Sequence, residues 1–592
     1  MALLNLCIAC CLTPSFASDL DLSWDGGVLG GLVVYELQGE SNGLAFLLPS
    51  FETGPTPLAL IDPGDPRELG VGLDLLPLLT VTVLDVAGEG VVAYPLPLTP
   101  SASGLVLRAQ ALSLGMNPSS SPIDAISSPV QTTLSLPDQL LPTALPPLDG
   151  RLGHTSTLLL DGRSLLIGGE VAVSGDVPSP LGSWEVYDPD TESFSQAGSG
   201  IGLGRSRHVA TLLQDGRVLV TGGFSVFPGQ PGGSTLSPPV RATSPGGFNI
   251  QQGLYSPGPP GASLSSPLLT PLPPAPPVPE GPAVLCSTML FDPGTDSFTA
   301  GPSMQTNRIQ HTAVLLEDGR VWVAGGKSGG YGFEHSLGGP VSAPLPANTE
   351  LFDPSTGSWS AGPSLPAGRF GHTATLRDDG TVLVCGGFLA TTSGGTWAAT
   401  DEVYVFDPSS DSLALSSLTL PEPRGFHSAV ESDGGVFVAG GAQSLTWLPG
   451  AGSGGQDLAE LTPVSVEAIS SASGGSAWTP LPVPVDPCPT CCSCIGQLIC
   501  HIDPQTGCRR YTSVNCPPED AVLPGGAELE HVIVSWLECP ALGYSVDTTL
   551  IPSLMAGHQA SAVGSERLLI TGAIEASPGV TEPAAFIYAL PE

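Results

Sequence analysis

The stretch QHTAVLLEDGRVWVAGG (residues 310–326) decides the fold, because variants of it occur six times along the chain. Each copy carries a His at its start, two short apolar runs around a tight turn, and a closing Gly-Gly or Gly-Ala. The six histidines are His154, His208, His311, His372, His427 and His558. A repeated module buries its apolar face only against its neighbours, so the pattern predicts a repeat architecture instead of one large core.

Two kinds of tight turn divide each copy into strands. Asp-Gly pairs such as Asp318-Gly319 separate the two apolar runs, and Gly accepts the positive φ that a hairpin turn requires. Asp-Pro pairs such as Asp353-Pro354 then mark a turn between a third and a fourth strand. The sequence therefore predicts four antiparallel strands per copy, with a period of about 50 residues.

These repeats resemble the kelch family, in particular the bacterial form found in the central domain of galactose oxidase. The resemblance covers residues 149–592 and implies an all-β fold, a kelch-type β-propeller with one blade per copy. Six copies predict six blades, or seven if residues 495–553 contain a degenerate one. We expect residues 134–146 to supply the missing strand of the last blade, because the sixth copy ends after a third strand. Such closure leaves no open edge between the first and last blades.

The segments before the repeats differ from them in composition. Residues 1–18 are apolar up to a Pro and end in small residues, which indicates a signal-like leader, although a basic start is missing. Residues 19–133 contain short apolar runs separated by Gly and Pro, which predicts a small β-sandwich as an accessory domain. Lipidation of Cys10 or Cys11 is an alternative use of the leader.

Composition and charge restrict the class of protein. The chain has 76 Gly and 63 Pro among 592 residues, as expected of all-β structure with many turns. Its net charge of −38 disfavours binding to nucleic acid, whose phosphates require basic side chains. No other segment is apolar for long enough to cross a bilayer. We expect an exported protein, secreted or at the bacterial cell surface, without a membrane span.

The two turns of each copy lie on one face of the predicted propeller, so the long insertions all lie on the other. These insertions are 225–283, which is rich in Pro, Gly and Ser, 327–339, 388–397 and the cysteine-rich 486–553. Variable loops on a rigid scaffold are the usual place for binding sites. The candidate ligand-binding residues in these loops are Tyr331, Phe333, Glu334, His335 and Trp397. Packing of the loop by its own aromatic residues is the alternative.

An Arg stands three residues before five of the repeat histidines. These residues are Arg151, Arg205, Arg308, Arg369 and Arg424. Arginines near the loop-rich face could hold an anionic ligand such as a sulfated or uronic glycan. Their presence in almost every copy favours a structural hydrogen-bonding role instead, and the same holds for the histidines, which are spread around a ring and predict no metal site.

Eight cysteines occur close together near the end of the chain. They are Cys488, Cys491, Cys492, Cys494, Cys500, Cys508, Cys516 and Cys539. An even number in a short exported segment predicts four disulfides, whose connectivity the spacing does not give. A zinc cluster that includes His501 is the alternative. Cys286 and Cys385 lie inside repeat strands, where we expect small buried side chains.

The copper chemistry of galactose oxidase does not transfer to this chain. In that enzyme a copper-binding tyrosine is followed directly by a histidine, and this sequence contains no Tyr-His pair. Motifs of serine hydrolases, zinc proteases and phosphate-binding loops are also missing. The sequence favours a non-catalytic propeller without a cofactor, which binds a protein or a glycan through its loop-rich face. A carbohydrate-active or oxidase-like enzyme with a site on the same face is the rival hypothesis.

Overall fold

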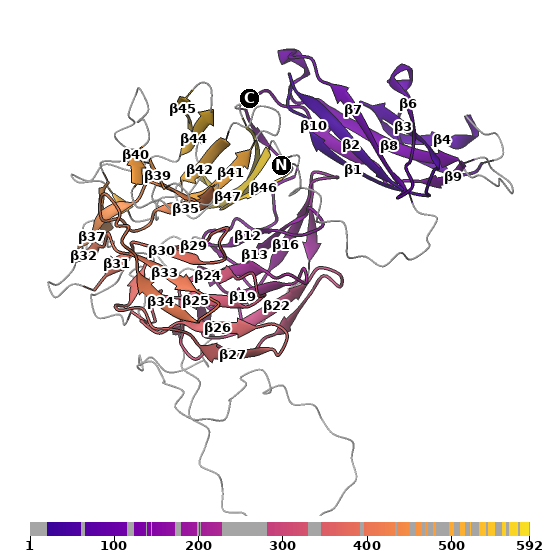
Figure 1. The fold of residues 1–592 in the computed structure, drawn as a ribbon. Helices are drawn as coiled ribbons and strands as arrows, with labels where there is room; N and C mark the ends of the chain where they lie inside the picture. Colours follow the sequence, from indigo (N-terminus) through magenta and orange to yellow (C-terminus); the bar gives the residue numbers. More distant parts are fainter. Residues whose placement is uncertain are drawn as a thin grey trace, which may run out of the picture.

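The structure is a computed structural model, and it is all-β, with many small antiparallel sheets (Figure 1). It describes residues 20–590 apart from a set of short segments and two longer ones. The segments outside the described residues, the chain ends included, are 1–19, 61–64, 115–122, 138, 144, 172–178, 198–200, 202, 228–280, 329–344, 391–395, 433–434, 449–457, 465–467, 472–477, 481–495, 503–508, 516–520, 523–531, 540–542, 551–558, 564–566, 578–579 and 591–592.

Two sheets form the N-terminal part of the chain. The first contains β1 (Asp21–Gly26), β2 (Leu32–Gln38) and β7 (Glu89–Pro95). The second contains β10 (Val130–Thr133), β8 (Val106–Leu114), β3 (Leu44–Ser50) and β6 (Thr80–Val83), with β9 (Ile123–Ile126) paired to β8. A hairpin of β4 (Thr53–Pro57) and β5 (Glu68–Val71) and the short 3₁₀ helices η1 (Leu58–Leu60), η2 (Leu76–Leu78) and η3 (Pro100–Ala102) complete it.

One apolar cluster joins the two N-terminal sheets. Alternate residues of β2, among them Val33 and Tyr35, point into this cluster, and Leu47 of β3 and Ala109 of β8 meet them from the second sheet. Alternation of buried and exposed residues is what a strand with one buried face requires. The sheets therefore pack face to face over a shared core.

Seven four-stranded sheets, here called units 1 to 7, follow along the chain. Unit 1 has β12 (Thr155–Leu158), β13 (Ser164–Ile167), β16 (Trp184–Asp188) and β17 (Ser193–Ala197); unit 2 has β18 (Val209–Leu212), β19 (Val218–Thr221), β22 (Thr288–Asp292) and β23 (Ser297–Ala300). Unit 3 has β24 (Thr312–Leu315), β25 (Val321–Ala324), β26 (Glu350–Asp353) and β27 (Ser358–Ala361); unit 4 has β29 (Thr373–Leu376), β30 (Val382–Cys385), β33 (Val403–Asp407) and β34 (Ser412–Leu415).

The last three units are less regular in sequence. Unit 5 has β35 (Ser428–Ser432), β36 (Gly435–Ala439), β39 (Ala468–Ser471) and β40 (Trp478–Pro480). Unit 6 has β41 (Gly496–Ile502), β42 (Arg509–Asn515), β44 (Val532–Cys539) and β45 (Gly543–Leu550), so four strands lie within the cysteine-rich stretch. Unit 7 has β46 (Gln559–Ala562), β47 (Arg567–Ser577), β48 (Val580–Ala589) and β11 (Leu140–Pro142), which pairs with β48 from the other end of the repeat region.

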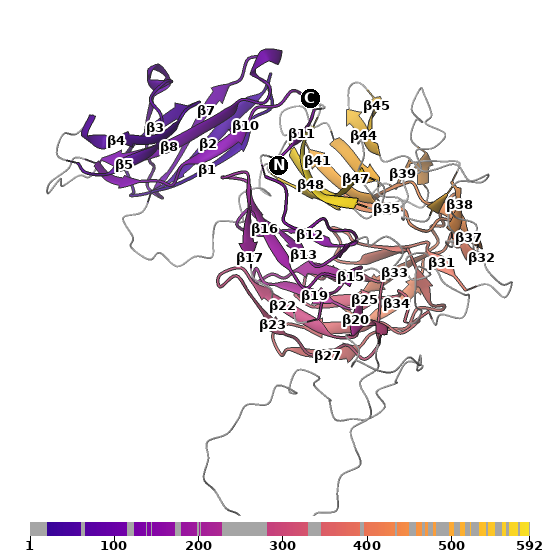
Figure 2. The same ribbon diagram turned by 180° about the vertical axis from the view of Figure 1, so that it is seen from behind.

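The first strands of consecutive units pack side by side. Contacts run from β12 to β18, β24, β29, β35, β41 and β46, and β46 in turn packs against β12. The fourth strands of units 1, 2 and 3 lie away from the first strands, at the outside (Figure 2). Tyr187 of unit 1 lies in the same apolar cluster as Leu569 and Ile587 of unit 7, so the first and last units share a core.

Apolar clusters also join the other neighbouring units. The second strands β13, β19, β25 and β30 are buried at every position, because sheets cover them on both sides. Leu165 of unit 1 packs with Val218 and Phe291 of unit 2, and Trp322 of unit 3 stacks on Phe406 of unit 4 at 4.5 Å between ring centroids. Continuous apolar strands are typical of sheets that are covered on both faces.

The Asp-Gly and Asp-Pro turns meet on one side of these sheets, here called the tight-turn side. Arg163, beside the Asp-Gly turn of unit 1, donates to the carbonyl oxygen of Pro293 in the Asp-Pro turn of unit 2 at 3.2 Å. Arg320 of unit 3 donates to that of Pro408 in unit 4 at 2.9 Å. The connections between second and third strands therefore lie on the opposite, loop-rich side.

Additional strands occupy the loop-rich side. They form two hairpins, β14 (Glu170–Val171) with β15 (Ser179–Pro180) and β20 (Phe224–Phe227) with β21 (Gly281–Val284). They also form an accessory sheet of β28 (Arg369–Phe370), β31 (Phe388–Leu389), β32 (Thr396–Ala399), β37 (Ala442–Leu448), β38 (Leu458–Pro463) and β43 (Ala521–Val522). Its strands β31, β32 and β37 lie beside the units in both views (Figures 1 and 2).

Candidate functional site

The repeat histidines join each unit to the one before it. In five units the His Nε2 and a Thr Oγ1 of the preceding unit form a hydrogen bond of 2.8–3.0 Å. The pairs are His154 with Thr571, His208 with Thr155, His311 with Thr221, His372 with Thr312 and His427 with Thr373. Burial lowers the pKa of His311 and of His372 to about 3, so both rings are neutral at neutral pH.

Among the described residues, these histidines are not part of a metal-binding group. No group of three or more His, Cys, Asp or Glu side chains in the described part of the chain could hold an ion. The Thr partner of each His lies on the neighbouring unit, which keeps the rings apart from one another. These contacts favour the structural role expected from the repetition.

The repeat arginines are also part of the framework. In five units the Arg Nη1 donates to the carbonyl oxygen of the first Gly of the Gly-Gly pair, at 2.8–3.1 Å. The pairs are Arg151 with Gly168, Arg205 with Gly222, Arg308 with Gly325, Arg369 with Gly386 and Arg424 with Gly440. All five arginines are buried. The predicted ligand-binding residues Arg151, Arg308, Arg369 and Arg424 therefore direct their guanidinium groups at the backbone of their own units.

Carboxylates of the third strands balance some of these buried charges. Glu350 accepts from Arg308 at 3.0 Å, and Glu185 accepts from Arg151 at 2.5 Å. Both carboxylates are as buried as their partners. Unit 2 has Met289 at this position, so Arg205 has no carboxylate there and donates to Ser287 instead, and burial lowers the pKa of Arg205 to about 10. A buried pair of this kind loses much stability when one member is removed.

Four of the remaining predicted ligand-binding residues lie outside the described residues, and Trp397 lies within them. Tyr331, Phe333, Glu334 and His335 lie outside the described residues, and so do Cys488, Cys491, Cys492, Cys494, Cys508 and Cys516. Cys500 lies in β41 and Cys539 in β44, where the backbone alone is described. Cys286 and Cys385 are free thiols, half-buried and buried respectively.

Trp397 is buried in an aromatic cluster beneath the accessory sheet. Its ring packs edge-on to Phe370 at 5.2 Å, and Phe370 also contacts Phe388 at 5.4 Å and Phe426 at 5.8 Å. Leu445 joins the same cluster from β37. Trp397 thus anchors the accessory sheet to units 4 and 5 and exposes no ring face to a ligand.

A row of left-handed residues lies next to the first strands on the loop-rich side. The residue before each repeat His has a φ between 52° and 63° in the units where it is described: Gly153, Arg207, Gln310, Gly371 and Phe426. This conformation is uncommon for residues other than Gly. The backbone N–H of Arg207 donates to Gly153 and that of Phe426 to Gly371, both at 2.7 Å, so the strained positions connect consecutive units.

Four residues in or beside this row differ from the residues at the same positions of the other units. We call them the mouth cluster: Glu170, Arg207, Lys327 and Phe370. Arg207 donates to the buried carboxylate of Glu170 at 2.5 Å. The Nζ of Lys327 lies 4.6 Å from the centroid of the Phe370 ring. Burial and, to a smaller extent, the positive charge of Arg207 lower the pKa of Lys327 to about 7. The cluster brings together units 1 to 4 and is the candidate functional site.

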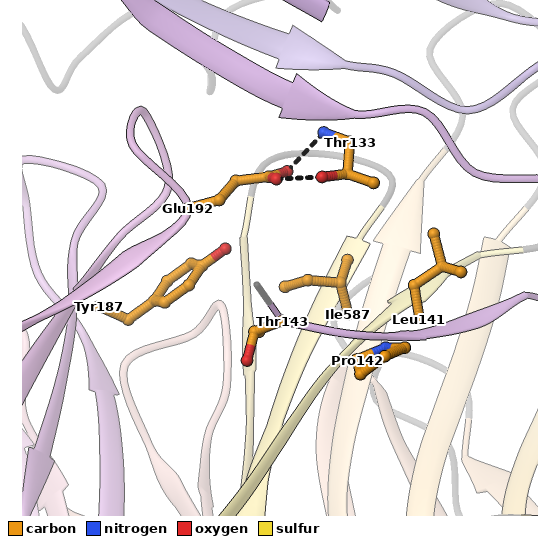
Figure 3. A pocket seen from close by; sticks show the side chains of 7 residues that line it. All are labelled: Thr133, Leu141, Pro142, Thr143, Tyr187, Glu192 and Ile587. Atoms are coloured by element: carbon orange, nitrogen blue, oxygen red, sulfur yellow. Dashed lines mark hydrogen bonds between the residues drawn. The ribbon is translucent and has the colours of Figure 1, made fainter. Parts of the chain in front are cut away.

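A pocket lies on the tight-turn side, between the N-terminal sheets and units 1 and 7 (Figure 3). Thr133 of β10 donates its backbone N–H to Glu192 Oε1 at 2.8 Å and its hydroxyl to Oε2, as the dashed lines in Figure 3 show. Tyr187 and Ile587 line the wall beside them. Because its polar groups already bond to one another, this pocket joins the domains and leaves little for a ligand.

Sequence patterns did not single out the mouth cluster. Lys327 was visible as the one lysine of the chain, at the start of a loop insertion, but its burial depends on Phe370 of a different copy. Glu170 and Phe388 occupy the position that follows Gly-Gly in their own copies, as Lys327 does in its copy. The useful signal was variation at a fixed position of an otherwise regular repeat.

No protein-family model matches the chain, and no curated protein matches it. Among solved structures, YjhT is similar to 69% of this chain, and the match covers 99% of YjhT. The two sequences are 13% identical, and the TM-score is 0.39. No helix among the described residues has the length and hydropathy needed to span a membrane.

Proposed function

We propose that residues 134–592 form a seven-bladed kelch-type propeller, preceded by a β-sandwich of residues 19–133. The packing of consecutive first strands, from β12 round to β46 and back to β12, supports the ring. The pairing of β11 with β48 supports closure of the last blade by residues near the start of the repeats. The four strands of unit 6 support seven blades over the six that the repeats alone predict.

We propose further that this propeller is an exported binding protein without catalytic activity, and that it takes a protein partner on its loop-rich side. One observation carries this proposal: the two sides of the units are used differently. The N-terminal sheets occupy the tight-turn side at units 1 and 7, through Thr133 and Arg567, and the accessory sheet extends the loop-rich side. The loop-rich side is the surface left for a ligand.

The outward face of the accessory sheet favours a protein over a glycan. Its inward residues, Trp397, Leu445 and Leu461, are buried in the aromatic cluster. Among its outward residues, Ala398 is exposed and pairs with the half-buried Leu389 and Ser444, and the half-buried Glu460 lies on the next strand. Sugar-binding sites usually offer exposed aromatic rings, and the outward side chains that the structure describes include none. These side chains are a mixture of apolar and polar groups, which is the composition of many protein–protein interfaces.

The test compares arrays of secreted proteins and of glycans, probed with the purified full chain. The double variant Ala398→Arg, Ser444→Arg places two long cations on the proposed face, and Ser360→Arg places one on the exposed outermost strand of unit 3 as the matched control. We expect binding to a protein that the double variant loses at least tenfold and the control retains. Binding to glycans alone, or equal binding by all three proteins, would contradict the proposal, and stoichiometric bound copper would contradict the absence of catalysis.

A further inference from the structure

Lys327 is the one place where the framework buries an amine. It follows Gly325-Gly326 and pairs with Ile309 in the bridge that opens the loop-rich side of unit 3. The corresponding positions of other units hold Glu170, Phe224, Phe388 and Ala442. These units fold without an amine at this position, so the amine of Lys327 has no role in the repeated framework.

The surroundings of the amine are apolar and cationic. Lys327 is 2% exposed, and its Nζ has no hydrogen-bond partner among the described residues. One side of the amine faces the ring of Phe370. The charged group that acts on it is Arg207, whose own carboxylate partner is Glu170. An ammonium without an acceptor is costly to bury, and the attraction of the Phe370 ring for a cation offsets only part of that cost, so burial lowers the pKa of Lys327 to about 7.

A neutral, desolvated amine beside another cation is the form in which lysine reacts with carbonyl groups. The lone pair that a protonated lysine lacks is available at neutral pH. The backbone of Lys327 pairs with Ile309 of unit 3, and its amine lies over the ring of Phe370 of unit 4 and within the electrostatic influence of Arg207 of unit 2, beside the row of left-handed residues. It is therefore held by three units at a fixed place and does not extend freely into solvent.

We propose that Lys327 captures a small aldehyde or ketone covalently, as an imine. The Nζ lone pair attacks the carbonyl carbon, a C–N bond forms, and the carbonyl oxygen leaves as water with both amine protons. The C=N double bond replaces the C=O double bond, so nothing is oxidised or reduced and no further reactant is needed. This inference goes beyond the proposed protein binding and does not depend on it, because it concerns the mouth cluster and not the accessory sheet.

The single lysine makes the test unusually direct. Folded full-length protein is treated at pH 7 with glycolaldehyde and sodium cyanoborohydride, which reduces an imine to a stable secondary amine, and peptides are mapped by mass. The chain has only two kinds of amine, Lys327 and the α-amino group at its start. We expect Lys327 in the folded protein to be labelled at least tenfold faster than the same residue in urea, where its pKa is ordinary.

Two variants keep the outcome interpretable. Lys327→Met should lose the label at this peptide while the α-amino group is still modified. Arg207→Gln removes the neighbouring cation, so the midpoint of the labelling rate against pH should move upward and labelling should recover at pH 9. Labelling of Lys327 in urea but not in the folded protein would overturn the proposal, and so would a rate that Arg207→Gln leaves unchanged at every pH. Loss of partner binding by the accessory-sheet variant with normal labelling would separate the two proposals.

Discussion

At the scale of residues, the repeated side chains form the frame and the exceptions to the repeat form the candidate site. Arg308 shows the first role: its guanidinium donates to the carbonyl oxygen of Gly325 at 2.8 Å and to Glu350 at 3.0 Å, with both side chains buried. Lys327 shows the second role, because its amine has no such partner in the described part of the chain. A position that repeats along the chain is explained by contacts within and between the units, and one that varies at a fixed place is open to function.

We expect Arg308→Met to lower the free energy of unfolding by about 3 kcal/mol or more, because it leaves the buried carboxylate of Glu350 without its cation. The matched control is Arg217→Met, whose ion pair with Asp215 is partly exposed at 2.6 Å. Exposed pairs contribute about 1 kcal/mol or less. Thermal unfolding of the two variants measures the difference. Equal melting temperatures would show that the buried pair is not part of the frame.

At the scale of elements, the structure adds strands that the repeat does not contain. The accessory sheet collects β28 and β31 from unit 4 and β37 from unit 5, and Trp397 of β32 fixes it to the units below. Trp397 was predicted as a ligand-binding residue because it lies in a loop insertion. Its burial follows from contacts with Phe370 and Leu445, which lie 27 and 48 residues away in the chain, so no local pattern could give it.

Trp397→Ala should loosen the accessory sheet and leave the units intact. Removing a buried Trp costs about 3–5 kcal/mol, and the described strands that pack on it share a single apolar cluster. Hydrogen exchange of the amides in β32 and β37 should become faster by at least a hundredfold, while that of β25 in unit 3 stays slow. Trp397→Phe is the conservative control. Equal protection in all three proteins would mean that the ring does not hold the sheet.

The sequence predicted the regular elements well and the irregular ones poorly. Asp318-Gly319 and Asp353-Pro354 gave the turns between β24 and β25 and between β26 and β27, because turn chemistry is local. The four strands of unit 6 do not follow the repeat's order of His, Asp-Gly and Gly-Gly, since their one His, His501, lies near the end of β41. Residues 495–553 therefore predict a seventh blade only if they contain a degenerate repeat. The predicted loop residues Tyr331 and His335 lie outside the described part of the chain.

The cysteines near unit 6 give a prediction about the cell compartment. Four disulfides are expected among the eight cysteines of 486–553 if the protein is exported. Alkylation of denatured protein without reductant should modify Cys286 and Cys385, the free thiols of the described residues, and none of those eight. Reduction should then expose eight further thiols. Alkylation of all eight before reduction would contradict both the disulfides and the export that they support.

At the scale of the whole molecule, one charged residue connects three parts of the chain. Arg567 of unit 7 pairs with Glu192 of unit 1 at 3.1 Å and donates to the carbonyl oxygen of Thr133 at the end of the N-terminal sheets. Its guanidinium also lies 5.2 Å from the ring of Trp24 in β1. These contacts hold the N-terminal sheets against the tight-turn side and join the first unit to the last.

We expect Arg567→Met to release the N-terminal sheets from the units without unfolding either. The buried Glu192 loses its cation, a change that costs about 3 kcal/mol at this interface. Small-angle scattering should give a larger radius of gyration for the variant, and calorimetry should give two separate transitions. Arg217→Met again serves as the control. One transition and an unchanged radius would show that the sheets are held by other contacts.

Our central claim concerns the mouth cluster, where the packed units bury an amine that the repeated framework does not use. A lowered pKa in the folded protein has a definite sign in stability. Between pH 7 and 10.5 the unfolded chain binds a proton at Lys327 that the folded one does not, so the free energy of unfolding rises with pH across this window. Below pH 7 the destabilisation is complete and constant.

One titration tests this claim directly. Protein grown with ¹³C-labelled lysine gives a single ε-carbon signal, because Lys327 is the one lysine of the chain. We expect its chemical shift to titrate with a midpoint near pH 7 in the folded protein and near 10.5 in urea. A midpoint near 10.5 in the folded protein would mean a hydrated or paired ammonium, and the mouth cluster would then be no candidate site.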